Sequence, residues 1–173
     1  MSKYIKIYDF IGFKICWLTC AMCSVWSKPY LGPLVTLIFI LIHLFLVKFN
    51  DRDIKIILTA IIMGFAIDSF FFQTNLILYK GGYLVNHNIA PLWIVSMWAG
   101  FSITLLYTLN KIKNNYNLAI LLGLIGGPLS YQAGVQIGSI SVNSNFAYLI
   151  LSITWGLVTP FLFYIINQLE ENA

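Results

Sequence analysis

The stretch "IILTAIIMGFAIDSFFFQTNLILY", residues 56–79, decides the fold class, because Asp68 is the only charged side chain in it. An α-helix rises about 1.5 Å per residue, so about 20 mostly apolar residues cross the hydrocarbon core of a bilayer. The whole chain has the same character. Of its residues 60% are hydrophobic and 9% are charged, whereas soluble domains contain about 25% charged residues. The sequence therefore predicts a membrane protein.

Other long apolar segments flank this one, and only short loops separate them. We predict an all-α fold, a polytopic transmembrane bundle of six helices that forms one domain over residues 1–173. The turn-rich stretch "GSISVNSN", residues 138–145, separates the last two helices, and His87 is expected in an outer loop. The predicted helices span residues 8–27, 30–48, 55–76, 89–110, 117–137 and 146–167.

Lysine and arginine are distributed unequally between the two sides that six crossings define. The opposite side from the termini carries Lys28 and Lys80, and Lys14 lies inside the first helix, where its amine is expected to reach back to the headgroups. Because basic residues favour the cytoplasmic side, we predict that both termini lie in the cytoplasm. The side that holds the termini carries Lys3, Lys6, Lys48, Arg52, Lys55, Lys111 and Lys113.

Asp68 is the main candidate for a functional residue. A carboxylic acid that faces lipid costs at least about 2.5–3.5 kcal/mol, so we expect this side chain to meet polar groups inside the bundle. His43 lies about 10 Å away in depth and is not expected to pair with Asp68 directly. Two interpretations stay open: a site for a ligand, a proton or a lipid headgroup, or a hydrogen bond between helices. The predicted polar site, in the outer half of the membrane, comprises Asp68, Asn75, Ser96, Trp98, Ser130, Tyr131 and Gln132.

Two groups of small residues predict close packing between helices. Cys16 and Cys20 lie on one face of the first helix, together with Ser24. With Cys23 they also form the C-x3-C-x2-C spacing of radical-SAM enzymes, but that motif belongs to a soluble α/β barrel, so we expect neither a metal nor a cofactor. In the fifth helix, paired G-x3-G spacings form a strip of Gly123, Gly127, Gly134 and Gly138.

Several segments carry a resemblance to a known family. They are "APLWIVSMW", residues 90–98, and "GGPLSYQAGVQIG", residues 126–138, with "WSKPYLGP", residues 26–33, and "AIDS", residues 66–69, in agreement. Through them the chain resembles a family of small bacterial inner-membrane proteins described only as a domain of unknown function. The resemblance covers nearly the whole chain and implies six membrane helices. It also implies a genomic association with cyclopropane-type fatty-acyl synthesis, and it supplies no catalytic residue.

Three functions are compatible with these features. The preferred hypothesis is lipid handling or lipid modification at the polar site. A small-solute transporter, or the substrate-binding membrane subunit of one, and a non-enzymatic membrane scaffold remain alternatives. Membrane lipids are the expected partners, and a second membrane protein that docks on the Cys16, Cys20 and Ser24 face is a further candidate. The chain has no run of basic residues, so no nucleic-acid partner is expected, and whether it is an enzyme stays undecided.

Overall fold

A computed structural model describes residues 3–81 and 89–171, so the expectation for His87 lies outside the described residues. Six α-helices form in these ranges, and the predicted number of helices is confirmed. The fourth helix continues into a π-helix, η1 (Thr104–Thr108), and a short 3-10 turn, η2 (Asn110–Ile112). The helices are α1 (Lys3–Val25), α2 (Leu31–Leu46), α3 (Asp51–Gln73), α4 (Leu92–Ile103), α5 (Tyr116–Ile137) and α6 (Asn145–Glu171).

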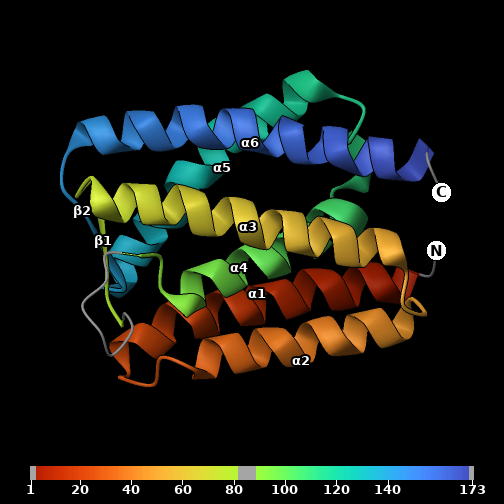
Figure 1. The fold of residues 1–173 in the computed structure, drawn as a ribbon, viewed down its shortest axis with the longest axis horizontal. Coiled ribbons are helices and arrows are strands. Elements are labelled where there is room, and N and C mark those ends of the chain that lie inside the picture. Colours follow the sequence, from red (N-terminus) through yellow and green to blue (C-terminus); the bar gives the residue numbers. More distant parts are fainter. Residues whose placement is uncertain (1–2, 82–88, 172–173) are drawn as a thin grey trace.

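The helices run along the length of the molecule, with the start of α1 and the end of α6 at the same end (Figure 1). Helices α1, α3, α5 and α6 are long and apolar enough to cross a membrane, whereas α2 and the continuous segment Leu92–Thr108 are shorter apolar helices. Helix α3 exposes Leu58 and Ile62 and buries Gly64 and Asp68. The outward face of α3 is thus apolar, and its inward face carries the acid.

A two-stranded antiparallel sheet at the opposite end was not predicted. Strand β1 (Ile77–Tyr79) pairs with β2 (Ile140–Val142), and Tyr79 lies opposite Ile140. Helix α3 therefore ends at Gln73, three residues before the predicted end at residue 76, and the turn-rich stretch before α6 contains a strand. The sheet holds Tyr79 beside the bundle core.

The start of α3 has a clear local signal. The side chain of Asn50 accepts a hydrogen bond from the backbone N–H of Arg52 at 2.9 Å, which is the usual role of an N-cap residue. Asp51 and Asp53 follow in the first turn, where carboxylates are favoured by the helix dipole. The cap fixes where α3 begins, and it thereby places Arg52 and Asp53 in the first turn of the helix.

Candidate functional site

Asp68 lies at the centre of a buried cluster of hydrogen-bond donors. Its side chain is fully buried. Tyr79 Oη donates to Oδ1 at 2.6 Å, Trp98 Nε1 donates to Oδ2 at 2.6 Å, and Tyr131 Oη also donates to Oδ1. These donors come from β1, α4 and α5, so one carboxyl group connects four elements of the fold. The cluster supplies the hydrogen-bond partners that a buried carboxyl group requires.

Local sequence explains why these donors reach Asp68. Gly64 lies one turn earlier on α3, and a Cβ atom there would overlap the Trp98 indole, so glycine is what lets the ring approach. Pairing of β1 with β2 holds Tyr79. Burial, and the nearby carboxyl of Asp68, raise the pKa of Tyr79 well above its ordinary value. The phenol therefore stays protonated and remains a donor.

The other residues of the predicted site lie elsewhere. Ser96 donates to the backbone of its own helix, and Gln132 accepts a hydrogen bond from Tyr148. Asn75 is exposed in the turn after α3. None of these three side chains has a hydrogen bond to Asp68 among the described residues. Of the predicted set, the structure brings together Asp68, Trp98 and Tyr131.

A cavity of about 550 Å³ lies between α1, α4 with η1, α5 and α6. Trp98 and Tyr131 line it, so Asp68 lies directly behind its wall. The Trp98 indole also stacks on Trp155, with ring centroids 4.5 Å apart, and Trp155 lines the cavity as well. Small-molecule sites usually have volumes of about 300–1,000 Å³ and mostly apolar walls with a few polar groups. The cavity has the size and lining of such a site.

The cavity opens between α1 and α5. The lining residues that are exposed come from these two helices: Phe10 and Lys14 from α1, and Leu122, Gly126 and Leu129 from α5. A Cβ atom at Gly126 would meet no other atom within 4 Å, so there is room for a side chain at this position of the rim. Because the rim lies within the length of both helices, the mouth faces sideways and not toward either end of the bundle.

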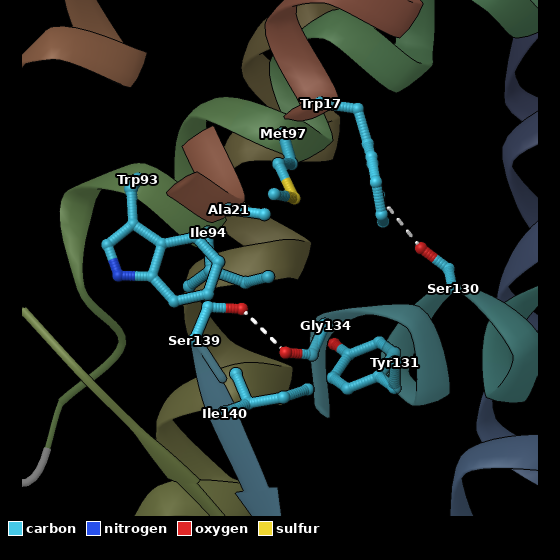
Figure 2. Close-up of a pocket in the computed structure, with 10 residues that line it drawn as sticks. All are labelled: Trp17, Ala21, Trp93, Ile94, Met97, Ser130, Tyr131, Gly134, Ser139 and Ile140. Carbon is cyan, nitrogen blue, oxygen red and sulfur yellow. Dashed lines mark hydrogen bonds between the residues drawn. The ribbon is translucent and has the colours of Figure 1, made fainter. Parts of the chain in front are cut away.

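Trp17 and Ser130 connect the two helices beyond this mouth. Trp17 Nε1 donates to Ser130 Oγ at 3.0 Å, and Figure 2 shows the two side chains pointing toward each other from α1 and α5. Both residues also line a second pocket of about 20 Å³, which is room for about one water molecule. The Trp17–Ser130 bridge therefore lies between the large cavity and this small pocket. Ser130 thus bonds to Trp17 at the cavity, whereas Tyr131 beside it lines the cavity and also donates to Asp68.

Three threonine hydroxyl groups that line the cavity have no hydrogen-bond partner among the described residues. They belong to Thr104, Thr108 and Thr159. A buried hydroxyl group without a partner costs about 1–3 kcal/mol. Thr104 and Thr108 stand at the two ends of the π-helix η1, and π-turns are frequent at functional sites. These are the groups that a bound molecule would satisfy.

A second buried polar cluster was missed by the sequence reasoning. His43 lies between two carboxyl groups: Nδ1 is 2.8 Å from Asp9 Oδ1, and Nε2 is 3.4 Å from Asp53 Oδ2. Tyr107 of η1 donates to Asp53 Oδ2. Asp9, His43 and Asp53 are completely buried. Each ring nitrogen of His43 thus faces one carboxyl oxygen, and the three side chains form a buried Asp–His–Asp triad.

Arg52 extends this cluster to the surface. Its Nε and Nη2 atoms donate to Asp53 Oδ1 at 3.1 and 3.0 Å, and Nη1 donates to Glu170 at 3.0 Å. Glu170 also pairs with Lys113. The network ties α1, α2, α3 and η1 to the end of α6. In the described part of the chain, no group of three or more His, Cys, Asp or Glu side chains is arranged to hold a metal ion.

The small residues lie where helices come close. A Cβ atom at Gly123 or Gly127 would overlap Trp155 of α6. Gly134 faces Ile140, and Gly138 ends α5 with a left-handed φ of 83°.

The cysteines of α1 pack in the same way, against α2. Cys20 Sγ is 3.4 Å from Thr36 Oγ1, and a Cβ atom at Gly32 would overlap the Cys20 backbone. Cys16, Cys20 and Ser24 are all buried within the chain. This corrects the expectation of a docking face for a partner at these residues, because their own chain already covers them.

The chain was compared with models of protein families, with curated proteins and with solved structures. The family model described as "Protein of unknown function (DUF2878)" matches residues 6–161, in agreement with the resemblance found in the sequence. No curated protein and no solved structure matches the chain.

Proposed function

The chain belongs to the DUF2878 family of proteins of unknown function, and we propose that it is a multi-pass protein of the bacterial inner membrane that handles or modifies lipids. The observation that carries the proposal is the cavity of about 550 Å³ with its sideways mouth between α1 and α5. A lipid in the bilayer reaches such a mouth without crossing water. A small water-soluble solute needs an opening at one end of the bundle, so the mouth favours the lipid over the solute.

The membrane orientation is part of this proposal. Four helices have the length and composition to cross a membrane, and the shorter apolar segments complete six crossings. Seven of the ten Lys and Arg residues lie at the end that holds the termini, which favours a cytoplasmic location for that end. A reporter fused after Ala173 tests it. Green fluorescent protein is expected to fluoresce there, and alkaline phosphatase is expected to be inactive. The reverse pattern contradicts the orientation.

Asp68 has a supporting role in this proposal. Its three donors include Trp98 and Tyr131, whose rings form part of the cavity wall. The carboxyl group therefore fixes the wall and does not itself face the lipid. This combines the two interpretations of Asp68, because the hydrogen bonds between elements are what give the ligand site its shape.

A cavity-filling variant tests lipid binding. Gly126→Phe places a large side chain in the mouth from a position where the first added atom meets nothing. Ile125→Phe is the matched control, because Ile125 is exposed and is not among the residues that line the cavity. We expect native mass spectrometry of the purified full-length protein to show co-purified lipid in the parent and in Ile125→Phe, and its loss in Gly126→Phe. Equal lipid in all three favours the scaffold alternative.

A further inference from the structure

The cavity contains one charged side chain that the proposed function does not use. We propose that the site is selective for an anionic amphiphile, a lipid with a phosphate or carboxylate group, and that Lys14 is the residue that determines this selectivity. The inference rests on the proposed lipid site and adds the chemical class of its ligand.

Lys14 is placed to meet a ligand at the mouth. Among the described residues that line the cavity, Lys14 is the only charged one. It is exposed at the rim, and Nζ lies 5.5 Å from the centroid of the Phe10 ring, another residue of the mouth. Within residues 3–81 and 89–171, the carboxylates that form ion pairs do so with His43, Arg52 or Lys113 and not with Lys14. The ammonium group is therefore available to an anion from outside the chain.

The interior of the cavity points to the same chemistry. Its unpartnered hydroxyl groups, on Thr104, Thr108 and Thr159, can each donate a hydrogen bond to a ligand oxygen. No described Asp or Glu is among the residues that line the cavity, so a negative group of a ligand meets no carboxylate there. A lysine at an apolar mouth and hydroxyl donors inside match a ligand that is apolar over most of its length and carries an oxygen-rich anionic group.

The test compares pairs of lipids that have the same acyl or alkenyl chains and polar groups of different net charge. Full-length protein in mixed micelles is titrated with phosphatidylglycerol against phosphatidylcholine of the same acyl chains, and with oleate against oleyl alcohol. Bound lipid is read by native mass spectrometry. One lysine near an anionic group contributes about fivefold in affinity. In at least one of the two pairs, we expect the parent protein to bind the anionic lipid about fivefold more tightly than the neutral one. A preference in the first pair indicates a phospholipid headgroup as the ligand, and a preference in the second pair indicates a fatty acid.

Two variants of the same helix isolate the residue. Lys14→Gln is expected to reduce the preference to less than twofold while binding of the neutral lipid is unchanged. Lys6→Gln removes the same charge from α1 at a position outside the cavity lining and is expected to keep the preference. Equal binding of charged and neutral lipids in the parent, or an unchanged preference in Lys14→Gln, overturns the inference while lipid binding itself stands. Failure to bind any of the four lipids overturns the proposed function as well.

Discussion

Trp98 donates a hydrogen bond to Asp68 across 2.6 Å, and the same indole forms part of the cavity wall. The Trp98 indole therefore contacts both the buried acid and the cavity. Asp68 holds the ring on its polar edge, and Trp155 stacks against its face. A change at the acid is thus expected to reach the cavity through the position of this ring.

Replacing Asp68 tests how much the cluster contributes to stability. Asp68→Ala leaves three buried donors without an acceptor, at about 1–3 kcal/mol for each unsatisfied group. Asp68→Asn keeps one oxygen for Trp98, and its amide can donate to the tyrosine hydroxyl groups, so a smaller loss is expected. SDS titration in mixed micelles gives the free energy of unfolding of both variants. Ser96→Ala is the control and is expected to stay within about 0.5 kcal/mol, because Ser96 bonds only its own helix.

Two neighbouring glycines predict opposite outcomes for the same substitution. Gly127 abuts the Trp155 ring, and a Cβ atom there would overlap it, whereas one at Gly126 would meet nothing within 4 Å. Gly127→Leu is expected to lower the free energy of unfolding by about 1–3 kcal/mol or more through overpacking. Gly126→Leu is expected to be neutral or stabilising by up to about 1 kcal/mol, because leucine has the higher helix propensity. Similar losses at both positions would contradict the packing of α5 on α6.

The sequence predicted the number of helices because long apolar segments with short charged breaks leave few alternatives. The sheet was missed for a physical reason. Three-residue strands at the end of a bundle produce no periodic signal, and Tyr79 therefore stood in a supposed loop beyond α3. The retrievable signal was the apolar Ile77–Tyr79 segment between turn residues. Depth along each helix correctly placed Trp98 and Tyr131 near Asp68, but it does not give the direction of a side chain, so Ser96 and Gln132 were grouped with them.

The Asp9–His43–Asp53 triad was missed because the depth argument was applied to too few residues. The depth argument was used to separate His43 from Asp68, and it was not applied to the carboxyl groups of α1 and α3 near the end that holds the termini. The cavity was beyond sequence reasoning, because it depends on how far α5 stands from α1.

His43 is expected to be the least replaceable member of the second cluster. His43→Leu leaves the buried carboxyl group of Asp9 without its partner and removes one from Asp53. Breaking a buried ion pair in this way costs about 3–5 kcal/mol. Lys113→Gln removes an ion pair nearer the surface, and Glu170 keeps Arg52, so a loss of less than about 1 kcal/mol is expected. The free energy of unfolding in mixed micelles is measured for both variants. Equal losses would show that the triad contributes no more to stability than the ion pair nearer the surface.

The unpartnered threonine hydroxyl groups predict effects of opposite sign on stability and on binding. Thr104→Val replaces a buried hydroxyl group that has no described partner with a methyl group of similar shape. Removing an unsatisfied polar group is expected to raise the free energy of unfolding of the lipid-free protein by up to about 1 kcal/mol. The same change removes a donor to the ligand and is expected to weaken lipid binding, measured by native mass spectrometry, several-fold. Thr36→Val is the control, because its hydroxyl group pairs with Cys20 outside the cavity, so it is expected to lose stability and keep lipid binding. A residue that served packing alone would not combine raised stability with weakened lipid binding. A loss of both stability and binding in Thr104→Val would contradict a role of these hydroxyl groups in the proposed site.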